Sequence, residues 1–181
     1  MLRIGITGHR WVTGQAAVLS GLGQIFDALG RIAPPPWTLL SSLAEGADRL
    51  VVEQARLRCP TTQLIVPLPL PVEEYCRDFA EPQSQEQFLT LLRSAAQVLP
   101  APVGCSTPQQ AYLQAGQVVV LESDLLLAVW DGLPARGMGG TAEVVALARS
   151  RAHPLAWLDS HSGQVTWERM ERLGGGEAAN P

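Results

Sequence analysis

Three short glycine-bearing turns constrain this chain most, because each follows a short apolar run and precedes a helical pattern. They are residues 5–10 (Gly-Ile-Thr-Gly-His-Arg), 41–48 (Ser-Ser-Leu-Ala-Glu-Gly-Ala-Asp) and 136–143 (Arg-Gly-Met-Gly-Gly-Thr-Ala-Glu). A strand that ends in such a turn leaves backbone N–H groups pointing out of the sheet, at the positive end of the next helix dipole. Three turns at one sheet edge predict a pocket for a phosphate-bearing ligand.

Apolar runs alternate with helical patterns along the chain, which predicts an α/β fold. Strands are expected at residues 2–6, 37–40, 64–66, 125–130 and 154–158, with an edge strand at 163–167. Helices are expected at residues 15–29, 44–58, 72–79, 82–96, 108–121 and 140–150. The continuous apolar run from residue 125 to 129 is typical of a parallel strand buried on both faces. We therefore expect a single Rossmann-like three-layer domain, with a mainly parallel sheet and helices on both faces.

The length and composition fit one domain. The chain has 181 residues, of which 46% are hydrophobic and 17% charged, so it can bury a core without disulfides or metals. We expect the domain to span residues 1–173 and a flexible tail to span residues 174–181. Residues 69–110 form a long connection, which is either a lid or an extra helical layer packed on the sheet. Within it, Tyr75 either closes over a ligand or packs between helices.

The charge balance and the cysteine pattern argue against several classes of function. A net charge of −4 without a basic run argues against a nucleic-acid partner. The three cysteines are isolated and the three histidines are scattered, which predicts free thiols in the cytoplasm and no metal site. We expect no membrane partner, because no apolar run is long and uncharged enough to span a bilayer. The apolar composition favours a homodimer.

The first turn offers Gly8, His9 and Arg10 to a phosphate. Glycine permits a close backbone approach, and Arg10 is able to pair a phosphate through two hydrogen bonds. His9 is a hydrogen-bond donor or an ordinary turn residue, with an acid or base role as the less favoured alternative. This turn is therefore a candidate phosphate site.

The second turn carries Ser42, Glu45, Gly46 and Asp48 at the start of a helix. Acidic side chains here complement the helix dipole and cap free N–H groups. The alternative is that Glu45 or Asp48 accepts hydrogen bonds from ribose hydroxyls, as acidic residues do in dinucleotide sites. The serine hydroxyls favour that alternative, so both interpretations stay open.

The third turn is the strongest anion-binding candidate, because it lies between the most apolar strand and a helix. Backbone N–H groups of Gly140, Thr141 and Ala142, with the Thr141 hydroxyl, are placed to hold one phosphate. Arg136 either pairs the same phosphate or is a solvated loop residue. The preceding strand ends in Trp130, which stacks a base or packs in the core. The candidate ligand-binding residues are Gly8, His9, Arg10, Ser42, Glu45, Gly46, Asp48, Asp131, Gly139, Gly140 and Thr141.

Taken in order, the three turns resemble the SLOG superfamily, the Rossmann-like group that includes the Lonely Guy phosphoribohydrolases and the DNA-processing protein A family. Residues 4–10 are similar to its first strand and loop, residues 41–48 to the turn of its second helix, and residues 139–143 to its glycine-threonine-x-glutamate turn. The likeness spans residue 1 to about residue 159, and residues 69–110 have no good counterpart. It implies a nucleoside monophosphate, an ADP-ribose derivative or another nucleotide as ligand.

The departures from this resemblance concern catalysis. Phosphoribohydrolases carry a P-G-G-x-G-T-x-E-E loop, whereas Arg136, Met138 and Val144 replace its proline, second glycine and second glutamate. Their arginine on the helix before the fourth strand falls near Ala115 and Gly116. The phosphate-binding turn therefore matches the phosphoribohydrolase pattern better than the catalytic residues do.

We accordingly predict a cytoplasmic nucleotide- or nucleotide-derivative-binding domain that acts as a sensor or carrier and requires no cofactor. The alternative is a nucleoside 5′-monophosphate phosphoribohydrolase. In that case Glu143 is the catalytic carboxylate and Arg136 takes the place of the missing helix arginine. DNA binding like that of the DNA-processing family is not expected from the acidic balance.

Overall fold

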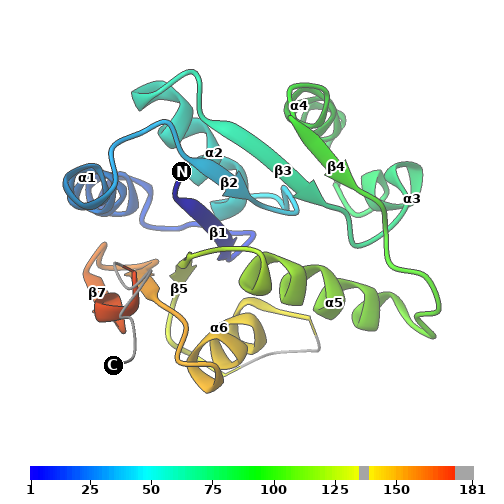
Figure 1. Ribbon diagram of the computed structural model, residues 1–181. Coiled ribbons are helices and arrows are strands. Elements are labelled where there is room, and N and C mark those ends of the chain that lie inside the picture. Colours follow the sequence, from blue (N-terminus) through cyan, green and yellow to red (C-terminus); the bar gives the residue numbers. More distant parts are fainter. Residues whose placement is uncertain (135–138, 174–181) are drawn as a thin grey trace.

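A seven-stranded, mostly parallel sheet forms the centre of the protein (Figure 1). The computed structural model describes residues 1–134 and 139–173. The strands are β1 (Arg3–Gly8), β2 (Thr38–Leu40), β3 (Gln63–Pro67), β4 (Gln97–Leu99), β5 (Leu125–Trp130), β6 (Leu155–Asp159) and β7 (Val165–Glu168). The helices are α1 (Gln15–Ile32), α2 (Ala47–Arg58), α3 (Val72–Cys76), α4 (Pro82–Arg93), α5 (Pro108–Leu121) and α6 (Thr141–Ser150), with a 3₁₀ turn at Met170–Arg172.

The strand order reverses between β1 and β5. The sheet order is β4-β3-β2-β1-β5-β6-β7, and only the last pair, β6 with β7, is antiparallel. The first four strands lie side by side in chain order, from β1 to β4 at one edge of the sheet. The chain then crosses back through α5, and β5 pairs with the other side of β1, with Ile4 opposite Leu125. In open α/β sheets, ligands bind beside the carboxyl ends of the strands at such a reversal. The predicted α/β Rossmann-like fold is confirmed.

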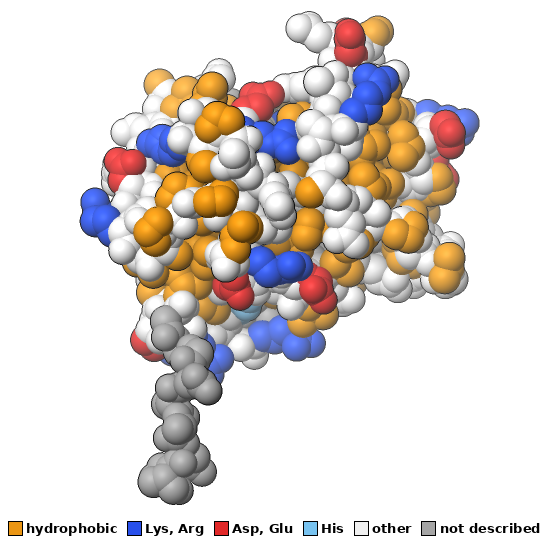
Figure 2. Space-filling model, turned by 45° about the horizontal axis from the view of Figure 1, so that its top comes forward, with side chains coloured by type: hydrophobic (Ala, Val, Ile, Leu, Met, Phe, Trp, Pro, Cys, Tyr) orange, Lys and Arg blue, Asp and Glu red, His pale blue; other side chains and the backbone are white. Residues whose placement is uncertain are grey.

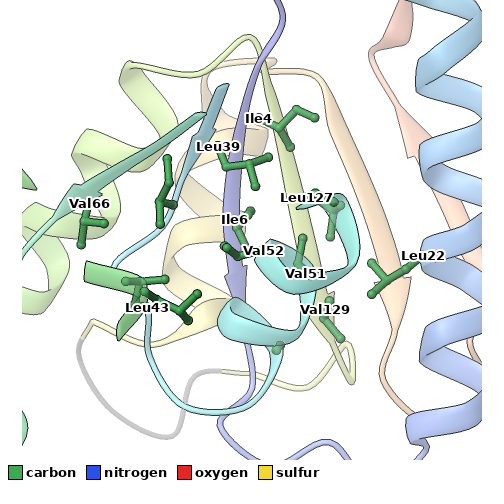
Figure 3. Close-up of a cluster of buried hydrophobic side chains, with 14 of the residues drawn as sticks. Ile4, Ile6, Leu22, Leu39, Leu43, Val51, Val52, Val66, Leu127 and Val129 are labelled. Carbon is green, nitrogen blue, oxygen red and sulfur yellow. The ribbon is translucent and has the colours of Figure 1, made fainter. Parts of the chain in front are cut away.

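Helices cover both faces of the sheet, with α1, α2 and α4 on one side and α5 and α6 on the other (Figure 1). Side chains of β5 alternate between the two cores, as the pleat requires. Leu127 and Val129 join the core under α1 and α2, which Figure 3 shows together with Leu22, Val51 and Val52. The even-numbered residues of β5 pack against α5 and α6 instead. The all-apolar sequence of β5 follows from this burial on both faces.

The strand β4 differs from the sequence prediction, which extended a helix over residues 82–96 and placed no strand between residues 66 and 125. The helix α4 ends at Arg93, and the backbone N–H of Ala96 donates to Leu64 O at 2.8 Å. Val98 then pairs with Val66 at the edge of the sheet. An edge strand of three residues, most of it exposed, is too short to show the alternation that identifies a strand.

The connection from residue 69 to 110 thus contains α3, α4 and β4. It contributes three aromatic rings, Tyr75, Phe79 and Phe88, to the larger core. Among the helices of residues 1–134 and 139–173, none is both long and apolar enough to cross a membrane. The tail expected at residues 174–181 lies outside the described residues.

Candidate functional site

A cavity of about 460 Å³ lies where the strand order reverses, at the carboxyl ends of β1 and β5. Its volume falls within the roughly 300–1,000 Å³ of small-molecule sites, which is room for a single nucleotide-sized group. The predicted ligand-binding residues that line it are Gly8, His9, Arg10, Ser42, Asp48, Asp131, Gly139, Gly140 and Thr141. The three turns therefore meet in space, as their place after the strands predicted.

Two glycines allow the first two turns to approach each other closely. A Cβ on Gly8 would lie 2.4 Å from the Cβ of Ala47 and 2.9 Å from Val129 O. Gly46 has a φ of +79°, and a Cβ there would lie 2.1 Å from Arg10 O. Gly46 does not line the cavity, so the structure gives it the role of bringing the start of α2 against the first turn.

His9 and Asp131 connect the ends of β1 and β5. Nε2 of His9 lies 3.0 Å from Oδ1 of Asp131 and 3.2 Å from its backbone nitrogen. The same Oδ1 accepts a hydrogen bond of 3.0 Å from the backbone N–H of Leu133. The backbone N–H of His9 donates to Val129 O at 3.1 Å. These contacts hold the rim of the cavity in place at the strand-order reversal.

Arg10 lies at the mouth of the cavity against the loop after α3. Its Nη2 is 3.6 Å from Oδ2 of Asp78, and its side chain is partly exposed. The hydroxyl of Tyr112, on α5, donates to the same Asp78 carboxylate. Burial, with the hydrogen bond to Asp78, raises the pKa of Tyr112, so its phenol stays neutral. Arg10 is thus a partly exposed guanidinium that shares the Asp78 carboxylate with Tyr112.

The two acidic residues of the second turn point in different directions. Asp48 is buried and lines the cavity, and its Oδ2 accepts a hydrogen bond of 2.7 Å from Ser41. Burial raises the pKa of Asp48 to about 7, although the Ser41 hydrogen bond opposes this. Glu45 accepts a hydrogen bond from the Ser84 hydroxyl of α4 and does not line the cavity. Of the two, only Asp48 is placed to contact a ligand.

The third turn presents the start of α6 to the cavity. The backbone N–H groups of Thr141 and Ala142 donate to no acceptor in the part of the chain that the structure describes. Gly139 has a φ of +84°, and its N–H donates to the carboxylate of Glu143. Glu143, the catalytic candidate, is therefore occupied by its own turn and does not line the cavity. Arg136, the other catalytic candidate, lies outside the described residues.

Aromatic residues lie in the cavity and next to it along the chain; the sequence indicated a ligand role for Tyr75 but none for Trp11 or Tyr112. Trp11, directly after Arg10, is 81% exposed, and its place beside a proposed phosphate site was a signal that could have been used. Tyr75 and Tyr112 line the cavity. Trp130 is only 7% exposed, because its ring packs 5.6 Å from that of Trp157. The Trp130 indole is part of the core. Among the aromatic side chains of the described residues, Trp11 is the most open to solvent, and it does not line the cavity.

The comparisons with known proteins give structural neighbours only, since no protein-family model and no curated sequence matches the chain. DNA processing protein A from Helicobacter pylori, solved for its single-stranded DNA binding mode, superimposes with a TM-score of 0.60 at 18% identity. That alignment covers 95% of this chain and 71% of the other. DNA processing protein A from Streptococcus pneumoniae gives a TM-score of 0.54 at 15% identity. Here 86% of this chain is covered, but only 49% of the neighbour, so the chain spans about half its length.

These neighbours overturn two expectations from the sequence. The interpretation as a small-molecule nucleotide sensor or carrier, with a phosphoribohydrolase as the alternative, is wrong, because two solved structures that share the fold are DNA processing proteins. The argument against a nucleic-acid partner is also wrong, because the Helicobacter pylori neighbour binds single-stranded DNA. The physical error was to treat a net charge as a surface property, when single strands are also bound by stacking on exposed aromatic rings.

The strand order, the meeting of the three turns and the two solved neighbours agree on the architecture. The DNA processing protein A family is one of the groups that the turns resemble. The chain therefore has a mostly parallel, Rossmann-like α/β fold, which it shares with these two DNA processing proteins.

Proposed function

We propose that this protein binds single-stranded DNA at the carboxyl edge of its sheet. The observation that carries the proposal is Trp11, an indole that is 81% exposed and directly follows the cavity-lining Arg10. Stacking of a base on an aromatic ring contributes about 1–3 kcal/mol per base, whatever the base. An exposed tryptophan beside a candidate phosphate site is the pairing of groups that a single strand requires.

The phosphate contacts come from two sides of the cavity. The backbone N–H groups of Thr141 and Ala142, which donate to no acceptor among the described residues, lie at the positive end of the α6 dipole, which favours an anion. Arg10 supplies a full positive charge with a planar fork suited to phosphate. In this proposal a phosphate contacts these groups, one neighbouring base stacks on Trp11, and another base enters the cavity.

Preference for a single strand follows from the size of the cavity and from the charge pattern. A cavity of about 460 Å³ admits one unstacked nucleotide and no base pair within a helix. On the face shown in Figure 2, basic and acidic side chains are interspersed, with no extended field of one sign. Duplex binding depends on many neutralised phosphates, whereas one or two contacts suffice here. The net charge of −4 is compatible with that small number.

A titration compares the two forms of DNA directly. A short, fluorescently labelled single strand is titrated with the protein by anisotropy, and unlabelled single strand or the matching duplex then competes for it. We expect the single strand to compete well and the duplex poorly. With one or two phosphates neutralised, the logarithm of affinity falls against the logarithm of salt concentration with a slope of about −0.7 to −1.4. Equal competition by the duplex, or no binding at all, contradicts the proposal.

A further inference from the structure

Tyr75 lines the cavity, and its hydroxyl is buried without a hydrogen-bond partner among the described residues. A buried hydroxyl without a partner costs free energy, so natural proteins seldom keep one without a use for it. Two other buried side-chain atoms share this state, one nitrogen of Arg49 and the hydroxyl of Thr62. Neither residue lines the cavity, and Arg49 satisfies its other nitrogens, with a bond of 2.9 Å to Leu43 O among them.

The ring of Tyr75 is fixed from several sides. Its centroid lies 4.9 Å from that of Phe79, 5.3 Å from Phe88 and 5.9 Å from Tyr112, all in edge-to-face arrangements. Burial raises its pKa, so the phenol stays neutral and is able both to donate and to accept a hydrogen bond. The hydroxyl is therefore held in one position before any ligand arrives, which reduces the entropy lost on binding.

Among the groups that line the cavity, the Tyr75 hydroxyl interacts most strongly with the carboxyl of Asp48, and also with Tyr112 and Arg10. A carboxyl beside aromatic rings is a poor environment for a phosphate, which is better placed at Arg10 and the start of α6. It is a good acceptor for the amino group of a base, and it keeps an acceptor oxygen whether or not it carries a proton. Asp48 and Tyr75 thus fit the polar edge of a base, while Arg10 and the start of α6 fit its phosphate.

We propose that Tyr75 and Asp48 together contact the polar edge of one unstacked base and select bases with an exocyclic amino group over thymine. This inference rests on the proposed binding of single-stranded DNA. The amino group of cytosine or adenine donates to Asp48, and the adjacent ring nitrogen accepts from the Tyr75 hydroxyl. Thymine presents a carbonyl oxygen in place of the amino group, so above about pH 7, where Asp48 is ionised, two acceptor oxygens face each other. The strands are therefore compared at pH 8.

The test is Tyr75→Phe, which removes the hydroxyl and keeps the packed ring. For the wild type, paired contacts of this kind predict that an oligo-dC strand binds roughly 5- to 150-fold more tightly than oligo-dT. In Tyr75→Phe this ratio falls toward one, while the Tm rises because an unpartnered hydroxyl is gone. Tyr112→Phe is the matched control for stability. It removes the same atom, but from a hydroxyl that donates to Asp78, so its Tm falls.

Each outcome decides the inference. A raised Tm together with a lost preference supports it, because a packing role cannot produce both. Equal binding of oligo-dC and oligo-dT by the wild type overturns it and leaves the proposed function standing. A lowered Tm with equally weakened binding of both strands makes Tyr75 a packing residue and also overturns it. If the wild type binds neither strand, the proposed function fails and the inference fails with it.

Discussion

Nε2 of His9 lies 3.0 Å from Oδ1 of Asp131, and this contact joins the carboxyl ends of β1 and β5 across the point where the strand order reverses. Both residues line the cavity, and Asp131 also holds the loop that follows β5 by accepting from the N–H of Leu133. The distance between the first turn and the end of β5 therefore depends on this pair.

Asp131→Ala is expected to weaken single-strand binding. The substitution removes the contact with His9 and leaves the backbone N–H of Leu133 without its acceptor. Asp124→Ala is its matched control, since Oδ2 of Asp124 accepts from the backbone N–H of Arg3 at 2.8 Å near the opposite end of β5. Each substitution should lower the free energy of unfolding by about 1–3 kcal/mol. Anisotropy titrations should show weaker binding for Asp131→Ala alone. Equal affinity for the two variants shows that the pair has only a structural role.

Trp11→Ala is expected to weaken binding by about 1–3 kcal/mol, roughly 5- to 150-fold, while Trp11→Phe keeps most of the affinity. The free energy of unfolding should change by less than about 0.5 kcal/mol, because the indole is 81% exposed. Leu57→Ala is the control, as Leu57 is 75% exposed on α2 and outside the cavity. An unchanged affinity of Trp11→Ala removes the main observation behind the proposed function.

Asp48 should make stability fall as the pH rises from about 4 to 7. The native carboxyl, with its pKa raised to about 7 by burial, holds a proton over this range. The same group in the unfolded chain releases its proton near pH 3.9. The native state therefore binds more protons, and the free energy of unfolding decreases with pH by an amount on the order of a few kcal/mol. Urea unfolding should show this slope, and Asp48→Asn should flatten it. The same slope in both proteins excludes Asp48 as the group responsible.

Gly139→Ala should destabilise the junction between α6 and α5. The residue has a φ of +84°, and a Cβ there would lie 2.7 Å from the Cβ of Tyr112 and 3.1 Å from Gln109 O. We expect a loss of about 1–3 kcal/mol in the free energy of unfolding, with weaker single-strand binding. Gly30→Ala is the control, because it lies within α1 with no atom within 4 Å of the added Cβ. Gly30→Ala should raise the free energy of unfolding by roughly 0.4–1 kcal/mol. Equal Tm values for the two variants contradict the predicted strain.

The parts of the fold that could be predicted from sequence are those with a strong local signal. The all-apolar run of β5 indicated a strand buried on both faces, and the glycine turns indicated where the strands end. The strand β4 was missed because three residues at an exposed sheet edge show no alternation. The fold class was therefore predictable, whereas the outer end of the sheet depended on pairing with β3, which is a contact between distant segments.

The candidate site likewise has features that local sequence predicts and features that depend on distant contacts. The three turns predicted the residues near the cavity, because parallel strands place their carboxyl ends at one edge. Directions of side chains were not predictable, since Glu45 bonds to Ser84 on a helix 39 positions away along the chain, while Asp48 points into the cavity. The prediction of a nucleotide sensor without a nucleic-acid partner was wrong for a different reason. Net charge says nothing about where an exposed indole such as Trp11 lies relative to Arg10.

The central claim is tested most directly by photo-cross-linking a single strand that carries 5-iododeoxycytidine and identifying the cross-linked tryptic peptides. All 13 basic residues of the chain are arginine, so trypsin separates residues 11–31, which contain Trp11, from the rest. We predict that cross-links fall on residues 11–31 and on residues 94–136, which contain Tyr112, and that Trp11→Ala loses the first set. Cross-links confined to residues 152–169, or none above those formed with the duplex, contradict binding at the carboxyl edge of the sheet.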